Sequence, residues 1–403
     1  MKVLICPLDW GLGHATRCIP LIRALLANHH HVLIGATGGG LQLLRKEFPD
    51  LDAFDFPGYR VRYSRSPALF LPIMLSQMAF LIAGLFRERS RLRRILREKS
   101  PDLVISDGRY GVFTRSVPSI FITHQVFIRV PGRFPGIALA EKLVLALNLR
   151  LLRKFSQVWV PDFAGPKNLS GDLSHQPCDL TNLVFINPLS RFGAGEIPAK
   201  PAAAIPEVEI LAMVSGPEPQ RGIFEAALSK ELEGMPGTRV LVRGLPGSSS
   251  AGMLTEAVFR PGTLNLFDHL PGDILAVLLS RAKLVVARAG YTTVMEMAGL
   301  GVKAAILVPT PGQSEQEYLA FHLRESGTAM CMDQENLNLS EAMRQIHGYS
   351  GFAAWSKERS DRQEDALVGA TLFDFLRSHP LFQPSGIPSI GSPVSSAKVG
   401  KTG

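Results

Sequence analysis

The sequence lacks the cysteine and charge patterns that mark several protein classes. Its four cysteines (Cys6, Cys18, Cys178 and Cys331) form no Cys-x-x-Cys pair and no cysteine–histidine metal spacing. This argues against a zinc module or a disulfide framework and favours a reducing compartment. Charged residues are scarce at 19%, yet 46% of the 403 residues are hydrophobic, which excludes wholesale disorder. A chain of this length suggests about two globular domains.

The net charge of +8 is concentrated in one stretch of the chain. Residues 60–100 contain ten Lys or Arg against two Asp or Glu, and the rest of the chain is balanced. A local basic zone predicts one anionic surface partner and argues against a nucleic-acid binder. The first residues, MKVLIC, run directly into a glycine loop, so we expect a first strand there instead of a signal peptide, and a cytoplasmic protein.

Residues 68–86 form a charge-free run whose nineteen residues approach the ~20 that cross a bilayer. Pro72, Ser76, Gln77 and Gly84 lower its hydrophobicity, and basic residues flank both ends, so a transmembrane span is the least favoured of three interpretations. The others are a buried or interface helix, and a helix that docks peripherally on an anionic membrane surface at the inner face of the cytoplasmic membrane. In the docked case, apolar burial and the neighbouring arginines would act together.

Short apolar runs alternate with amphipathic stretches through most of the chain, which predicts an α/β fold of two Rossmann-like, doubly wound parallel-sheet domains. A proline-rich segment separates them, because proline at that density cannot continue a helix or a central strand. Strands are expected at 2–6, 31–35, 103–106, 119–123, 158–160, 184–187, 208–214, 239–242, 263–267, 284–287, 304–308 and 329–331. The expected units are an N-terminal domain at 1–190, a linker at 191–206, a C-terminal domain at 207–350, a final helix at 351–377 and a disordered tail at 378–403.

A glycine loop follows the first strand and opens a helix. Gly11 and Gly13 allow a tight turn and a close approach of a ligand to the free N–H groups at the helix start. Thr16 stands where a dinucleotide fingerprint needs its third glycine, and the loop has no Gly-Lys-Ser/Thr, so neither a dinucleotide site nor a P-loop is expected. His14 could act as a general base at neutral pH, or it could merely hydrogen-bond the loop.

Polar residues follow two further strands of the same half. Asp107 comes just after the run 103–106 and could orient His14 and stabilise its charged form. The alternative for Asp107 is an Asx-turn residue. His124 and Gln125 follow another strand in the same layer, and they either line the same cleft or hold a loop.

The strongest local pattern lies at 285–296, where a strand turns into a helix. Gly290, Thr292 and Thr293 offer backbone N–H groups and hydroxyls that suit a diphosphate at the positive end of the helix dipole. Arg288 precedes them as a further donor-side candidate. Glu296 could accept two hydrogen bonds from vicinal ribose hydroxyls, or it could simply stabilise the start of the helix.

Other loops after strands of the second half offer polar groups. Gln313 and Gln316 carry side-chain amides suited to sugar hydroxyls, although their segment could be a plain strand–helix turn. The remaining candidates at strand ends, the first three for a second anion contact, are Ser215, Gly216, Arg221, Arg243 and Gly244.

Together these residues resemble those of the GT-B glycosyltransferases, which use nucleotide-sugar donors. The sequence is most similar to the peptidoglycan lipid-intermediate N-acetylglucosaminyltransferase and its relatives. The resemblance runs to about residue 377 and is most specific in GLGHATR near the start and in ARAGYTTVMEMAGLG followed by PTPGQSEQEYLA. It implies an acceptor-binding N-terminal half, a donor-binding C-terminal half facing it across a cleft, and a final helix that crosses back onto the first domain.

The resemblance also implies roles for single residues. His14 matches the loop histidine that serves as base or acceptor-site residue, and Asp107 resembles its paired aspartate in plant enzymes. Gln316 is followed by Glu317 where the peptidoglycan enzyme has paired glutamines, so the sugar is not fixed. The implied donor contacts are the diphosphate at 290–293, the ribose at Glu296, the sugar at Gln313 and Gln316, and the nucleobase along Phe267, His269 and Leu270.

The expected reaction is an inverting, metal-independent transfer of a hexosyl group from a UDP-linked donor to a hydroxyl acceptor, which the resemblance suggests is lipid-linked. His14, helped by Asp107, would remove the acceptor proton. No cofactor is expected, because the nucleotide sugar is a substrate, and no Asp-x-Asp pair is placed for a metal. Two alternatives stay open: a nucleotide-sugar epimerase or hydrolase of the same architecture, and a non-catalytic nucleotide-sugar-binding protein docked on a membrane.

Overall fold

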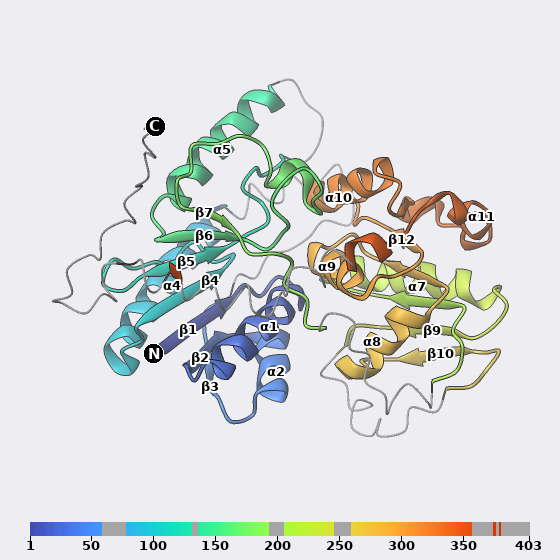
Figure 1. The fold of residues 1–403 in the computed structure, drawn as a ribbon, viewed down its shortest axis with the longest axis horizontal. Coiled ribbons are helices and arrows are strands. Elements are labelled where there is room, and N and C mark those ends of the chain that lie inside the picture. The colour runs from blue at the N-terminus through green and yellow to red at the C-terminus, as the bar shows by residue number, and fades with distance from the viewer. Residues whose placement is uncertain are drawn as a thin grey trace, which may run out of the picture.

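The computed structural model describes residues 1–58, 78–130, 136–192, 205–245 and 259–356, together with 374, 375 and 379. Two parallel sheets organise the chain, one in each half, and helices pack against them (Figure 1). The expected fold class is confirmed: both halves are doubly wound α/β units.

The first half contains a seven-stranded sheet with the order β3-β2-β1-β4-β5-β6-β7. Its strands are β1 (Lys2–Pro7), β2 (His31–Ala36), β3 (Asp52–Asp55), β4 (Leu103–Asp107), β5 (Ser119–Ile122), β6 (Gln157–Val160) and β7 (Leu183–Phe185). Its helices are α1 (Gly13–Ala27), α2 (Gly38–Glu47), α4 (Met78–Lys99) and α5 (Ile137–Leu152), with the 3-10 turn η2 (Gly171–Leu173). Every residue of β4 is buried, as expected for a central strand with helices on both faces.

The register of this sheet shows that α4 and α5 cover the same face. Val104 and Ser106 lie two residues apart on β4 and therefore share a face, and Ser106 pairs with Phe121. Leu92 of α4 packs in the cluster that contains Val104, and Leu152 of α5 packs in the cluster that contains Phe121. The opposite face packs against α1 and α2.

The second half contains a six-stranded sheet with the order β10-β9-β8-β11-β12-β13. Its strands are β8 (Ile210–Met213), β9 (Arg239–Val242), β10 (Leu264–Phe267), β11 (Leu284–Ala287), β12 (Ala305–Leu307) and β13 (Met330–Cys331). Its helices are α7 (Gln220–Glu233), α8 (Gly272–Arg281), α9 (Tyr291–Leu300), α10 (Ser314–Glu325) and α11 (Leu339–Gln345), with the 3-10 turns η4 (Gln334–Asn336) and η5 (Ile346–Gly348).

All twelve expected strands are present, with ends that differ by at most two residues. The edge strand β3 was not expected, because its sequence DAFD has too few apolar residues to signal a strand. The described residues leave out most of the linker 191–206, most of the final helix 351–377, nearly all of the tail 378–403, and residues 68–77 of the apolar run. Within the described part of the chain, no helix is long and apolar enough to cross a membrane.

Candidate active site

Each sheet has one point where its strand order reverses, and several of the candidate residues lie there. In the first sheet this point lies between β1 and β4, whose carboxyl ends meet where Pro7 pairs with Asp107. In the second sheet it lies between β8 and β11, which end together at Met213 and Ala287. Ligands of open α/β sheets bind in the crevice at such reversal points.

His14 and Asp107 are in contact at the first reversal point. His14 lies in the first turn of α1, just after β1, and its Nδ1 is 3.1 Å from Oδ1 of Asp107 at the end of β4. The Asp107 side chain is fully buried, whereas 19% of the His14 side chain is exposed. Gly108 lets the chain pass beside the imidazole, because its φ is +74° and a Cβ there would lie 3.1 Å from His14 Cε1.

Arg17 joins this pair, although the sequence analysis did not single it out. Its Nε donates to Asp107 Oδ2 at 2.7 Å, its Nη2 donates to Asp107 Oδ1, and Nη2 also lies 2.9 Å from His14 Nδ1. A periodicity argument could have found it, because residues three apart on a helix share a face. Thr16, between them, is buried.

The charges at this cluster determine the protonation of the pair. Burial raises the pKa of Asp107, but the charges of Arg17 and His14 and their hydrogen bonds outweigh it, so the net pKa is well below the usual range. Burial lowers the pKa of His14, and the charge of Arg17 lowers it further against the opposing effect of Asp107. His14 is therefore neutral at neutral pH, the form that a general base requires.

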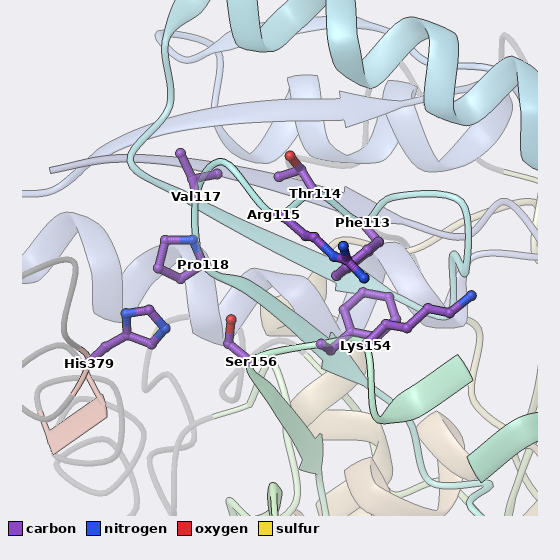
Figure 2. Close-up of a pocket in the computed structure, with 9 residues that line it drawn as sticks. Phe113, Thr114, Arg115, Val117, Pro118, Lys154, Ser156 and His379 are labelled. Atoms are coloured by element: carbon purple, nitrogen blue, oxygen red, sulfur yellow. The ribbon is translucent and has the colours of Figure 1, made fainter. Parts of the chain in front are cut away.

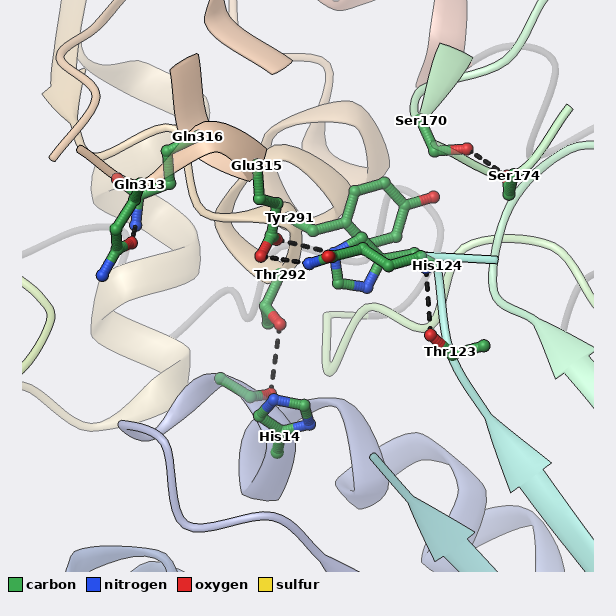
Figure 3. Close-up of polar contacts among 12 residues, drawn as sticks. His14, Thr123, His124, Ser170, Ser174, Tyr291, Thr292, Gln313, Glu315 and Gln316 are labelled. Atoms are coloured by element: carbon green, nitrogen blue, oxygen red, sulfur yellow. Dashed lines mark hydrogen bonds and ion pairs between the residues drawn. The ribbon is translucent and has the colours of Figure 1, made fainter. Parts of the chain in front are cut away.

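His124 and Gln125 connect the two halves. His124 Nε2 lies 2.6 Å from Oε1 of Glu315 at the start of α10, and Gln125 also donates to Glu315 (Figure 3). The His124 ring stacks on Tyr291 of α9, with centroids 4.2 Å apart. The sequence analysis missed Glu315, and no local pattern marks it, because its partners are about 190 residues away.

The start of α9 touches the first glycine loop. Gly290 is the N-cap residue, the first turn carries no acidic residue, and Thr292 Oγ1 donates to the Gly13 carbonyl at 3.1 Å (Figure 3). A Cβ on Gly13 would lie 3.0 Å from Thr292 Oγ1, so glycine permits this close approach. Thr293, the next residue, is part-exposed in the same turn. The positive end of α9 thus faces the loop that carries His14.

Glu296 lies one turn further along α9 and is ion-paired. Arg191 Nε is 2.8 Å from Glu296 Oε1, and the Glu296 side chain is only 7% exposed. Burial raises the pKa of Glu296, and Arg191 offsets only part of that effect. The sequence analysis did not single out Arg191.

The two glutamines of the loop before α10 interact with each other. Gln316 Nε2 donates to Gln313 Oε1 at 2.6 Å, and the Thr310 N–H donates to Gln316 Oε1 at 2.9 Å. Both glutamines lie at the N-terminal end of α10 and face each other, whereas Glu315 points toward His124 (Figure 3). The adjacent Glu317 instead holds the loop by accepting from the Gly312 N–H.

The structure places three predicted arginines in other surroundings. Arg221 pairs with Glu218 and Glu225, and Arg243 pairs with Glu225 and Asp268. Arg288 is 1% exposed, lies over the Phe224 ring and donates to the Val308, Pro309 and Gln220 carbonyls. Arg288 is thus part of the core, and the other two side chains are neutralised by carboxylates.

The remaining candidates lie in loops at the carboxyl edges. Gly11, Gly216 and Gly244 have positive φ angles, and a Cβ on Gly244 would lie 2.4 Å from the Val214 carbonyl oxygen, so those turns require glycine. Ser215 adjoins Gly216 and is exposed. Leu270 belongs to the core of the second half and Phe267 packs against the same cluster. Burial lowers the pKa of His269.

A cavity of about 190 Å³ lies away from these residues (Figure 2). It is lined by Val117 and Pro118, which precede β5, and by Ser156, which precedes β6. These positions are at the amino edge of the first sheet, opposite the His14 edge, so the cavity is not the candidate site. In the described residues, no group of three His, Cys, Asp or Glu side chains could hold a metal ion.

Comparison with known proteins agrees with this architecture. Residues 273–366, which contain α9 and α10, match the glycosyltransferase family 28 C-terminal domain. An uncharacterized glycosyltransferase of Methanosarcina acetivorans is 26% identical over 343 residues, 81% of this chain and 82% of that protein. Another from Methanosarcina mazei is 24% identical over 346 residues, with coverages of 81% and 84%.

Solved glycosyltransferases share the fold. Spinosyn rhamnosyltransferase SpnG matches with a TM-score of 0.61 and 17% identity over 93% of this chain and 99% of that one. Glycosyltransferase VinC in complex with dTDP matches with a TM-score of 0.58 and 17% identity over 94% and 99%. The protein therefore has the GT-B fold and is a glycosyltransferase. The resemblance to the peptidoglycan enzyme in particular stays a prediction.

Proposed function

We propose that the protein transfers a hexosyl group from a nucleotide-diphosphate sugar to a hydroxyl acceptor. The contact between Thr292 and Gly13 carries this proposal, because it sets a helix start suited to a diphosphate against the loop of a candidate base. The glycosyltransferase domain at 273–366 includes that helix start. Solved neighbours are complexes with thymidine diphosphate and with an aglycone, which supports a donor of this class and a separate acceptor.

The proposed reaction is a single displacement with inversion. His14 Nε2 takes the proton of the acceptor hydroxyl, and that oxygen forms a bond to the anomeric carbon as the bond to the diphosphate breaks. The α9 N–H groups and Thr293 meet the negative charge that develops on the leaving diphosphate. These groups act without a metal ion in the proposed mechanism.

Asp107 and Arg17 support the base in this scheme. Asp107 is held ionised by Arg17, and an ionised carboxylate stabilises the imidazolium that forms when His14 takes the proton. Because Asp107 is buried and fixed by two hydrogen bonds from Arg17, its negative charge stays in place beside His14 as the imidazolium forms.

Calorimetry with nucleoside diphosphates tests the donor site. We propose a uridine donor, although the solved neighbours include complexes with dTDP, so UDP, dTDP and GDP are compared on the full chain. Binding of UDP in preference to the others supports the proposal. Replacing Thr293 with Val should weaken binding by about ten- to a hundredfold, since one hydrogen bond to a charged group contributes about 1.5–3 kcal/mol. Thr263→Val, at an exposed position just before β10, is the matched control.

Turnover separates the transferase from its alternatives. The best-binding nucleotide sugar is incubated with the protein alone and then with hydroxyl acceptors, including lipid extracts, and products are identified by mass spectrometry. A glycosylated acceptor with the opposite anomeric configuration supports the proposal. Product from the donor alone favours an epimerase or hydrolase, and tight binding with no product in any mixture favours a non-catalytic binding protein.

We also propose that the first half docks on an anionic membrane surface, where a lipid-linked acceptor would lie. On α5, Leu139, Leu143 and Leu147 are 60–64% exposed at a spacing of four residues, which puts them on one side of the helix. At the start of α4, Phe80 and Phe86 are 72% and 67% exposed. Exposed apolar side chains of this kind, those of α4 lying in the basic stretch 60–100, favour an interfacial site.

The two helices can act together because they cover the same face of the first sheet. Each follows a strand of a parallel sheet, so its first turns lie at the carboxyl edge, the edge of His14. Arg87 and Arg89 follow the exposed phenylalanines on α4 and would meet the lipid phosphates.

Co-sedimentation with lipid vesicles tests this docking. We expect binding to vesicles with phosphatidylglycerol and little binding to pure phosphatidylcholine. A Leu143→Ser, Phe86→Ser double variant should lose most of the binding. The control is Leu266→Ser, Phe321→Ser, which removes two comparably exposed side chains from the second half. Equal binding by both double variants would contradict the proposal.

A further inference from the structure

A single guanidinium connects the titratable groups at the first reversal point. Besides its two hydrogen bonds to Asp107, Arg17 reaches His14 Nδ1 through Nη2 at 2.9 Å and His124 Nδ1 through Nη1 at 3.3 Å. Arg17 is 2% exposed, so these contacts are not exchanged with water. The hydrogen bonds between Arg17 and these side chains therefore determine which ring nitrogens of His14 and His124 carry a proton.

His14 Nδ1 has two partners with opposite requirements. An ionised Asp107 only accepts hydrogen bonds, so its contact requires a proton on Nδ1. Arg17 only donates, so its contact requires a lone pair on the same atom. A neutral imidazole can satisfy one of them. With the proton on Nδ1, Nε2 is free to act as a base, and with the lone pair on Nδ1, the proton is on Nε2 and the base is absent.

The geometry favours Arg17 as the partner of His14 Nδ1. The nitrogen lies 2.9 Å from Arg17 Nη2 and 3.1 Å from Asp107 Oδ1. Asp107 already accepts two charge-assisted hydrogen bonds from the same guanidinium, so it depends less on a further donor. Burial and the charge of Arg17 both lower the pKa of His14, which keeps the ring neutral and makes the choice between partners necessary.

His124 shows the same arrangement with less ambiguity. Its Nε2 faces a carboxylate oxygen of Glu315 at 2.6 Å and must carry a proton to donate there. Its Nδ1 is then a lone pair that accepts from Arg17. One guanidinium therefore donates to the Nδ1 atoms of both rings, and the second ring is held by the C-terminal half.

We propose that Arg17 is a positioning residue that fixes the tautomer of His14, with the proton on Nε2 while the two halves are in this arrangement. The base forms when Nδ1 takes a proton from solvent, which it holds in the hydrogen bond to Asp107, and Nε2 gives its own proton to solvent, so that the ring is neutral before and after the change. This inference rests on the proposed role of His14 as base. The titratable and charged side chains around the site are His14 and Cys18 on α1, Asp107 after β4, His124 after β5, and Tyr291 and Glu315 from the second half.

Nuclear magnetic resonance tests the tautomer without any substrate. The full chain is labelled with ¹⁵N-histidine, two-bond ¹H–¹⁵N spectra are recorded at neutral pH, and His14 is assigned by the signal missing in His14→Gln. In the wild type we expect His14 with its proton on Nε2. In Arg17→Lys, which keeps a positive charge beside Asp107 but loses the planar fork, we expect the proton on Nδ1 and a higher His14 pKa.

The matched control is Arg23→Lys, the same substitution at an exposed position of α1 that pairs with Glu47, and it should leave the His14 signals unchanged. A wild-type His14 with its proton on Nδ1, or the same tautomer in wild type and Arg17→Lys, would overturn the proposal. If Arg17→Lys does not fold, the wild-type spectrum alone decides. The tautomer is read separately from turnover, so a failed transferase assay and a failed tautomer prediction are distinguishable.

Discussion

Asp107 in the first half and Glu296 in the second are buried carboxylates, each beside one arginine, but their pKa values move in opposite directions. Burial raises both pKa values. At Asp107 the charges and hydrogen bonds of Arg17 and His14 outweigh burial and the net pKa is lowered. At Glu296 burial outweighs Arg191 and the net pKa is raised. The neighbouring groups, and not burial itself, decide the sign.

The difference lies in how many contacts each carboxylate makes. Both oxygens of Asp107 accept hydrogen bonds from Arg17, and Oδ1 also contacts His14. Glu296 has one ion-pair contact, between its Oε1 and Arg191 Nε. A carboxylate that is fully occupied serves as a fixed charge, whereas one with a single contact can take a new partner such as a ribose hydroxyl. Asp107 is thus arranged to hold a charge, whereas Glu296 has room for a further partner.

The largest expected effect comes from removing the fixed charge. Asp107→Asn leaves the Arg17 guanidinium buried without its carboxylate, so the free energy of unfolding should fall by about 3–5 kcal/mol. Urea unfolding measures it. The same change at Asp52, whose side chain is 55% exposed and pairs with Lys99, should cost about 0–1 kcal/mol. Equal losses of unfolding free energy in Asp107→Asn and Asp52→Asn would contradict the distinction between the buried and the exposed ion pair.

The next effect concerns His14, the proposed base beside Asp107. His14→Ala should lower kcat by about 10²–10⁴-fold, because it removes general-base catalysis, while calorimetric affinity for the nucleoside diphosphate changes little. The control is His347→Ala, at an exposed position of η5 in the second half. Unchanged turnover in His14→Ala would exclude His14 as the base, and loss of donor affinity instead would assign it a binding role.

Glu296 allows a test of the other carboxylate, on whether it binds a ligand. If Glu296 accepts from ribose hydroxyls, Glu296→Gln should weaken UDP binding by about ten- to a hundredfold, since hydrogen bonds to charged groups contribute about 1.5–3 kcal/mol. The 2′-deoxy nucleotide separates this from a general loss, because wild type should discriminate against it and the variant should discriminate much less. A variant that keeps full discrimination would show that the ribose contacts other groups.

The opposite pKa shifts also predict opposite dependences of stability on pH. Asp107 has a folded-state pKa below its usual 3.8, so its ionised form stabilises the fold above that pH, and this is lost as the pH falls through the lowered value. Glu296 has a folded-state pKa above its usual 4.5, so its protonated form stabilises the fold below that pH, and this is lost as the pH rises through the raised value. Urea unfolding from about pH 4 to pH 7 should show wild type losing more stability than Glu296→Gln.

The sequence predicted much of the fold because its signals are local. Buried strands read as short Val/Ile/Leu runs, and the reversal-point loops follow them directly, so His14 and Asp107 could be paired from sequence. Glu315 could not, because its contact with His124 joins two halves of the chain and depends on how they pack. Arg191 could not be predicted for the same reason, because its partner Glu296 is about a hundred residues away in sequence.

The positive charge of a residue did not show from sequence which groups lie around it in the fold. Arg243 was a donor-site candidate because it stands at the end of a strand, and the structure shows Glu225 and Asp268 beside it. A sequence pattern indicates that an arginine could bind a phosphate. It does not indicate that a carboxylate from another element is already paired with that arginine.

Arg243 therefore gives the smallest expected effect. Because two carboxylates already neutralise its guanidinium, we expect Arg243→Gln to change UDP affinity by less than about twofold, far less than Glu296→Gln. Its side chain is 36% exposed, so the free energy of unfolding should fall by only about 0–1 kcal/mol. Calorimetry and urea unfolding measure the two quantities. A tenfold loss of UDP affinity would mean that Arg243 leaves its carboxylates when the donor binds, and the second half would then exchange partners at two places instead of one.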